Sequence, residues 1–174
     1  MNSLLTSNSY LLNIMNIIIV GCGRCGSRLG RRLAESGNRV SVVDITRAAF
    51  NRLGPNFQGS TYQGSGLDQE VLIRAGLENA DIVFALTGGD NRNLMIAQLV
   101  KIQFSVERAV ARLHDPVRAE KYHEMGLETI CTTTITSGLL ELYATNGSFP
   151  ETSCDLAIHG DHSMLQEIKK QEIK

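Results

Sequence analysis

Three glycines at the spacing G-x-G-x-x-G occupy residues 21–26, directly after an apolar segment. The motif follows a predicted buried strand and opens a predicted helix, which is the context in which it binds phosphates. Gly21 permits a tight turn, Gly23 lets backbone amides approach a pyrophosphate, and Gly26 lets the helix pack closely on the strand. The amino terminus of the helix supplies N–H groups and a positive dipole end. This pattern predicts a site for nucleotide phosphates.

An acidic residue, Asp44, stands at the end of the second predicted strand, eighteen residues beyond Gly26. A carboxylate at this place accepts hydrogen bonds from the adenosine ribose and repels a 2′-phosphate. We therefore expect NAD or an adenine nucleotide rather than NADP. The alternative is that the glycines only shape a turn and Asp44 caps the next helix.

Three further residues near predicted strand ends could face such a ligand. Arg24 lies inside the glycine loop, where the helix dipole disfavours a cation unless an anion is near, so it either contacts a phosphate or is simply solvated. Thr87 and Gly88 follow the fourth predicted strand, and Arg112 ends the fifth. Ligands of open α/β sheets bind at this carboxyl edge. Arg112 could equally form a surface salt bridge.

Cys22 and Cys25 form a C-x-x-C, a spacing found in redox and zinc sites. The chain has no second C-x-x-C and no histidine close to this one in sequence, so we expect small side chains that pack within the loop. The four histidines share no ligand spacing and are predicted to lie at the surface: His114, His123, His159 and His162. No metal site is expected.

Composition narrows the class of protein further. The 174 residues carry 17 basic and 18 acidic side chains, a formal net charge of -1, so a phosphate-neutralising surface for nucleic acid is not expected. Aromatic residues make up 5% of the chain, too few for a base-stacking platform. Four cysteines are too few for a disulfide-built module. These features predict a compact domain of the cytosol.

Strand and helix patterns alternate six times along the chain. Strands are predicted at residues 17–20, 40–43, 59–63, 81–86, 106–111 and 128–132, and helices at 27–36, 46–53, 68–76, 91–104, 117–125 and 137–144. Short connections between alternating elements favour parallel strands and right-handed crossovers. The fold class is therefore predicted as α/β, a doubly wound Rossmann-like sheet of about six parallel strands with helices on both faces.

Three regions follow from this pattern. Residues 1–14 are interpreted as an extension of little structural weight, since no basic residue precedes Arg24 and the apolar run is about half as long as a membrane span. Residues 15–145 form the nucleotide-binding domain. Residues 146–174 form a linker and a short C-terminal helix.

No constellation of catalytic residues is evident, and a dehydrogenase usually needs substrate-binding and proton-transfer groups on a further domain. A binding module is the simpler interpretation. The alternative is a small NAD-dependent oxidoreductase or its cofactor-binding fragment.

These residues carry a resemblance to a known family. Residues 15–140 resemble the nucleotide-binding N-domain of RCK/KTN proteins, the cytoplasmic regulators of Trk and Ktr potassium transport. The matching stretches are MNIIIVGCGRCGSRLGRRL, VSVVDI, YQGSG, AGLENADIVFALTGGDNRNLM and ARLHDP.

The resemblance implies NAD(H) or ATP/ADP bound as a regulatory ligand and not turned over. By position, the ligand contacts would fall on Gly21, Cys22, Gly23, Arg24, Cys25, Asp44, Gly64, Ser65, Thr87, Gly88 and Arg112. Many members have an acidic residue where this chain has Ser65. Some ATP-binding members use a Glu for a divalent ion in the region that reads Cys-Thr-Thr-Thr here, at residues 131–134.

The resemblance also implies partners. Members form a homodimer or larger ring that contacts a membrane-embedded potassium transporter subunit at the inner face of the membrane. Late helices contribute to subunit contacts, and residues 137–144 here offer the apolar side chains Leu139, Leu140, Leu142 and Tyr143. Ordinary packing on the last strand is the alternative. The family's C-terminal sensing domain is expected to be absent. The chain would then be a stand-alone N-domain, a truncated product or one half of a split system.

Overall fold

The structure is a computed structural model and describes residues 14–149. Almost all of the predicted N-terminal extension, and the predicted C-terminal helix, lie outside the described residues. The chain divides into two compact units, residues 1–130 and 131–174, and each is described by itself. Within the described part of the chain, no helix has the length and apolarity needed to cross a membrane.

Six parallel strands form a single sheet in the order β3-β2-β1-β4-β5-β6. Their bounds are Asn16–Val20 for β1, Arg39–Asp44 for β2, Ser60–Gln63 for β3, Ile82–Ala85 for β4, Arg108–Leu113 for β5 and Glu128–Cys131 for β6. β1 pairs with both β2 and β4, so the strand order reverses beside it. The predicted doubly wound α/β fold is confirmed, and its switch point lies at the end of β1.

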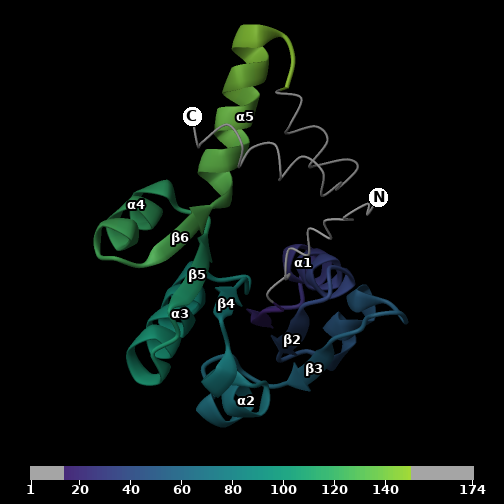
Figure 1. Ribbon diagram of the computed structural model, residues 1–174. Helices are drawn as coiled ribbons and strands as arrows, with labels where there is room; N and C mark the ends of the chain where they lie inside the picture. The colour runs from purple at the N-terminus through teal and green to yellow at the C-terminus, as the bar shows by residue number, and fades with distance from the viewer. Residues whose placement is uncertain (1–13, 150–174) are drawn as a thin grey trace, which may run out of the picture. The chain divides into compact units, whose positions relative to one another are not determined.

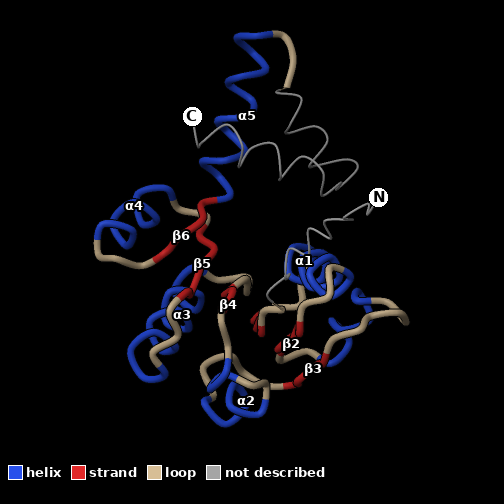
Figure 2. Tube along the Cα trace, in the orientation of Figure 1, coloured by secondary structure: helices blue, strands red, loops and turns tan. Residues whose placement is uncertain are grey.

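Helices connect these strands. Their bounds are Arg24–Glu35 for α1, Gln69–Arg74 for α2, Asp90–Phe104 for α3, Pro116–Glu124 for α4 and Thr132–Asn146 for α5, with 3₁₀ helices η1 at Arg47–Leu53 and η2 at Leu77–Asn79. α1 and α2 lie on opposite sides of β1 and β2 (Figure 1). The strands form the centre of the larger unit, and helices and loops surround them (Figure 2).

The core is densest along β1. Ile17, Ile18, Ile19 and Val20 are each at most 2% exposed, as expected for a β-branched strand with both faces covered. Below α1, a cluster including Ile17, Ile19, Val40, Val42 and Leu53 fills one side of the sheet. This rigid centre fixes the positions of the loops at the carboxyl edge.

Three predicted boundaries were wrong for local reasons. α1 begins at Arg24 rather than at residue 27, because Gly23 is its N-cap and the last glycine of the motif already lies in its first turn. β5 begins two residues later than predicted, because Ser105 takes a left-handed φ of 55° and ends α3 there. α5 begins at Thr132 rather than at 137, because the Cys131 Sγ accepts a hydrogen bond from the Thr134 N–H at 3.5 Å.

The element predicted at 46–53 is a 3₁₀ helix, and Thr46 does not cap it with its side chain. Asp68 caps α2, since its Oδ1 accepts from the Glu70 N–H at 3.0 Å. Gly76 follows α2 with φ at 95°, a left-handed conformation that ends the helix.

Candidate functional site

The glycine loop joins β1 to α1 at the switch point of the sheet. Gly21 has a φ of 110°, and a Cβ there would lie 2.8 Å from the backbone carbonyl of Leu86. A Cβ on Gly26 would lie 1.9 Å from the Gly21 carbonyl oxygen, so the first turn of α1 rests directly on the end of the strand. Both glycines therefore have the roles that the motif predicts.

The middle glycine faces open space. A Cβ on Gly23 would have no atom of the described structure within 4 Å, and Gly23 has no side-chain cap over it. The first turn of α1 contains no acidic residue that could satisfy its N–H groups. The loop is thus an uncovered cradle of backbone donors, the geometry that an anion requires.

Asp44 lies against this cradle. Its Oδ2 accepts a hydrogen bond from the Cys22 N–H at 2.7 Å, and its Oδ1 accepts one from the Thr46 N–H at 2.8 Å. The carboxylate therefore connects the end of β2 to the glycine loop, and each oxygen keeps capacity for a further donor. The alternative reading, in which Asp44 only caps the next helix, accounts for one of these two bonds.

A cleft of about 740 Å³ opens at this edge, within the size range of small-molecule sites. It brings together ten of the twelve predicted site residues, namely Gly21, Gly23, Arg24, Cys25, Asp44, Gly64, Ser65, Thr87, Gly88 and Arg112. Cys22 and Gly26 are buried and do not line the cleft. The cleft also contains Arg92 and His114, which the sequence analysis did not place there.

The far wall of the cleft is built around Arg112. Its Nη2 donates to the Thr87 carbonyl oxygen at 2.9 Å, and its Nε is buried without a hydrogen-bond partner in the described structure. Arg112 is half-buried, and no salt bridge to it is found among the described residues. A buried guanidinium N–H without a partner suits an anionic or carbonyl group at that wall, which fits a nucleotide in the cleft.

Asn93 holds this wall in place, although no site role was predicted for it. The residue is fully buried in the first turn of α3. Its Oδ1 accepts from the Thr87 N–H at 2.8 Å and from the Thr87 hydroxyl at 2.7 Å, while its Nδ2 donates to the carbonyls of Thr87 and Arg112. The signal available in the sequence was an amide side chain at a position where the helix faces the sheet. A buried side-chain amide needs hydrogen-bond partners.

Asp90 and His114 form a second bridge across the same wall. The His114 Nδ1 lies 2.8 Å from the Asp90 Oδ1, and the N–H groups of His114 and Asp115 donate to the Asp90 Oδ2. Burial alone would raise the pKa of Asp90, but these hydrogen bonds and the His114 charge hold the pKa below its ordinary value. His114 is exposed, as predicted, and it also lines the cleft.

The two loop cysteines differ sharply. Cys22 is fully buried, with its Sγ 3.4 Å from the Ala49 carbonyl oxygen, whereas Cys25 is exposed. Burial and then the nearby Asp44 charge raise the pKa of the Cys22 thiol to about 11, against the opposing charge of Arg52. Within residues 14–149, no group of three His, Cys, Asp or Glu side chains is arranged to hold a metal ion.

Charge around the cleft favours an anion. The guanidinium groups of Arg24, Arg92 and Arg112 line it, while Asp44 is the one carboxylate among its lining residues. Ile45, Leu67 and Leu86 supply apolar surface beside them. The site therefore combines a hydrogen-bonding carboxylate, an apolar patch and a cationic wall, as an adenine nucleotide would need.

Comparisons with known proteins identify the family of the chain. Residues 17–133 match the TrkA-N domain. The chain is 42% identical over 118 residues to "Trk system potassium uptake protein TrkA" of Streptomyces coelicolor, which covers 68% of this chain and 53% of that protein. The chain spans about half the length of the first curated relatives that it matches.

Two solved structures share the fold. One is a Kef C-terminal domain of Shewanella denitrificans in an AMP-bound form, with a TM-score of 0.65, 22% identity and coverage of 87% of this chain and 96% of that one. The other is a GsuK channel bound to NAD, with a TM-score of 0.56, 21% identity and coverage of 67% and 21%. At these identities the likeness is one of fold.

Proposed function

Because the chain belongs to the TrkA-N domain family, we propose that it is a nucleotide-sensing regulatory subunit of a potassium uptake system of the Trk/Ktr type. The observation that carries the proposal is the contact between Asp44 and the glycine loop at the mouth of the cationic cleft. A regulatory part, rather than an enzyme, agrees with the names of the curated relatives, which are potassium uptake proteins.

The proposed ligand is NAD(H) or ATP/ADP. The Asp44 carboxylate would hold the ribose hydroxyls, and the amides of the glycine loop would hold the first phosphates. Thr87, Gly88 and Arg112 would meet the distal end of the ligand. The bound nucleotide would supply phosphate charge and hydrogen-bonding groups, and the residues of the cleft supply binding and orientation.

This arrangement would connect two loops that the fold holds separately. The glycine loop belongs to β1 and α1, whereas Thr87 and Arg112 belong to the wall that Asn93 fixes to α3. A ligand that contacts both sides stabilises one arrangement of the two, and ligands of different length would do so to different extents. The chain would lie on the cytoplasmic side, beside a membrane-embedded transporter subunit. From there, the difference between the two arrangements would be passed to the pore.

Calorimetry with NAD, NADH, ATP and ADP tests the ligand, and the Asp44→Ala variant tests the site. We expect saturable binding of at least one of these ligands and a clear loss of affinity in the variant. The same samples, incubated with NAD and candidate substrates, test the oxidoreductase alternative, because cofactor turnover would contradict a regulatory role. Potassium uptake in cells that lack their own Trk regulator tests the partner.

A further inference from the structure

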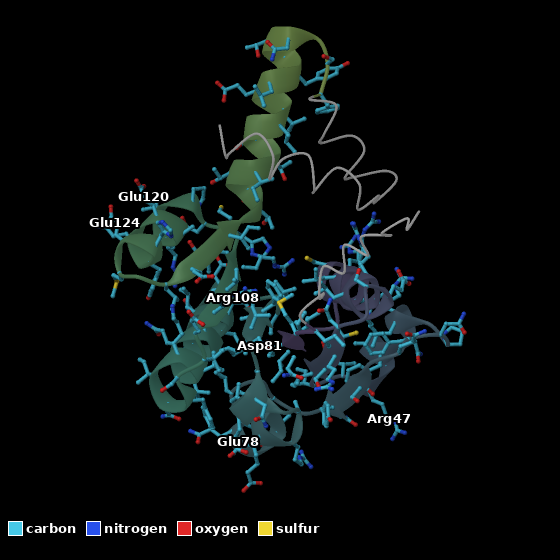
Figure 3. All side chains as sticks on the ribbon, viewed as in Figure 1. Arg47, Glu78, Asp81, Arg108, Glu120 and Glu124 are labelled. Carbon is cyan, nitrogen blue, oxygen red and sulfur yellow. The ribbon has the colours of Figure 1, made fainter. Side chains whose placement is uncertain are left out.

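Charge is distributed unevenly over the larger unit. Residues 24–53 contain seven arginines and two carboxylates, whereas residues 59–130 contain seven basic and ten acidic side chains. The first group belongs mainly to α1 and η1, and the second includes α2 and α4. In Figure 3, Arg47 extends from the side that carries η1, while Glu78, Glu120 and Glu124 point away from other sides of the unit. A net charge near zero therefore conceals a basic face.

Five exposed arginines make up this basic face: Arg24, Arg28, Arg31, Arg47 and Arg52. In α1 the buried residues Gly26, Gly30 and Ala34 face the sheet, and at about 100° per residue Arg24, Arg28 and Arg31 fall close together on one solvent-facing side of the helix. η1 packs beside α1, since a Cβ on Gly30 would lie 3.7 Å from the Leu53 side chain. The arginines of both helices thus share one surface.

The nucleotide cleft does not account for this face. Arg24 lines the cleft, but Arg28 and Arg31 lie about 6 and 10 Å further along the helix axis and are not among its lining residues. α1 carries four arginines against one carboxylate, Glu35, and the helix dipole disfavours the cation of Arg24 in its first turn. Sequences break such local rules where a functional surface requires it.

We propose that the basic face of α1 and η1 docks directly on the surface of a bilayer that contains anionic phospholipid. A flat array of phosphates matches the extent of the face, which exceeds one nucleotide, and guanidinium groups suit phosphate oxygens better than ammonium groups do. The acidic remainder of the unit would be repelled by the same surface, so binding would occur in one orientation. A second copy as occupant would instead pair the basic face of one molecule with an acidic side of the next, a head-to-tail contact that would appear as self-association in the absence of vesicles.

Sedimentation with vesicles tests this proposal on the full 174-residue chain without nucleotide. Vesicles of equal parts phosphatidylglycerol and phosphatidylcholine are compared with vesicles of phosphatidylcholine alone, at low and at high salt. The test variant is Arg28→Glu with Arg31→Glu. The matched control is Arg74→Glu with Lys121→Glu, which changes the net charge equally on α2 and α4, away from the basic face.

We expect binding to the anionic vesicles at low salt and its loss at high salt. The test variant should bind these vesicles at least about tenfold more weakly than the wild type, since each basic residue near the surface increases the affinity several-fold. The control should bind within about twofold of the wild type. Equal binding to both vesicles, no binding to anionic vesicles, or an equal loss in both variants would overturn the proposal. Calorimetry of the same variants with nucleotide separates this outcome from failure of the proposed function, because neither pair lines the cleft.

Discussion

Asp44 holds its place through two backbone bonds, one to the glycine loop and one to Thr46. Because the Asp44 side chain both shapes the loop and faces the cleft, its removal has two consequences. The N–H of Cys22 loses its acceptor, and the ligand loses the carboxylate that would bind its ribose.

Replacing Asp44 with Ala should therefore weaken binding of NAD and of ADP by roughly 1–3 kcal/mol, the cost of leaving such groups without partners. Calorimetry measures the loss for each ligand. Asp68→Ala is the matched control, since it also removes a carboxylate that accepts a backbone N–H but lies at the start of α2. Unchanged affinity in the Asp44 variant would remove this residue from the site.

Cys22 adds a pH dependence of stability. Burial, and then the Asp44 charge, raise the pKa of its thiol from 9.0 to about 11. As pH rises from 9 to 11, the unfolded chain loses the thiol proton while the folded chain keeps it, so the free energy of unfolding falls across this window. Below pH 9 the stabilisation is fully present.

The difference in free energy of unfolding between the wild type and Cys22→Ala should therefore shrink by roughly 1–3 kcal/mol from pH 9 to pH 11. Urea denaturation at a series of pH values measures it. Cys25→Ala, which removes the exposed thiol of the same loop, should show no comparable trend. Parallel pH profiles for wild type and Cys22→Ala would contradict a buried neutral thiol.

At the scale of elements, two loops form the far wall of the cleft because α3 and β5 are joined by buried polar bonds. Asn93 makes four hydrogen bonds, to Thr87 and to Arg112, at the start of α3. Asp90 adds three bonds to the segment that follows β5. The wall is thus preorganised before a ligand arrives.

Asn93→Ala should lower the free energy of unfolding by about 2–4 kcal/mol, because it leaves buried backbone groups without partners. It should also weaken nucleotide binding through the displaced Thr87. Asn91→Ala is the control, as Asn91 lies exposed on the same helix and accepts a hydrogen bond from the Arg118 side chain. Urea denaturation compares the two variants, and equal losses would show that α3 is simply sensitive to alanine at its start.

Sequence periodicity predicted the elements of this sheet well, because a β-branched strand such as β1 and a glycine motif constrain the chain locally. The ends of elements were less predictable. The start of α5 among three threonines depends on a thiol acceptor, and the start of β5 depends on the left-handed Ser105. The helix and strand propensities of the residues predict neither feature.

The candidate site also contains some residues that a sequence pattern predicts and others that it does not. The spacing of the glycines and of Asp44, at the ends of the first two strands, predicts them as site residues, and the fold brings them together. Arg92 and His114 line the cleft, and Asn93 supports its wall through a hydrogen bond to Arg112, nineteen residues along the chain, so no short motif contains all three. The predicted contacts remain predictions about binding, and the cleft is the geometry that supports them.

At the scale of the whole molecule, a ligand can control a partner only if two bodies move against one another. The larger unit contains the cleft, and the second unit contains α5, none of whose fifteen residues is buried. Ile135, Leu139, Leu142 and Tyr143 recur at helical spacing along α5, and the Tyr143 ring lies 4.7 Å from that of Phe149. Such an apolar stripe, left exposed, is the mark of a protein contact.

The last prediction is a homodimer built on this stripe of α5. Burying apolar side chains against their copies in a second chain would remove them from water at about 25 cal/mol per Å², and a two-fold axis makes one stripe complementary to itself. The wild type should sediment as a dimer or larger assembly, whereas Leu142→Glu with Tyr143→Glu should give monomers that still bind nucleotide. Ser137→Glu with Ala144→Glu adds the same charge on the opposite side of the helix and should leave the assembly intact. A wild-type chain that stays monomeric at high concentration, with and without NAD or ATP, would remove the second body that this mode of regulation needs.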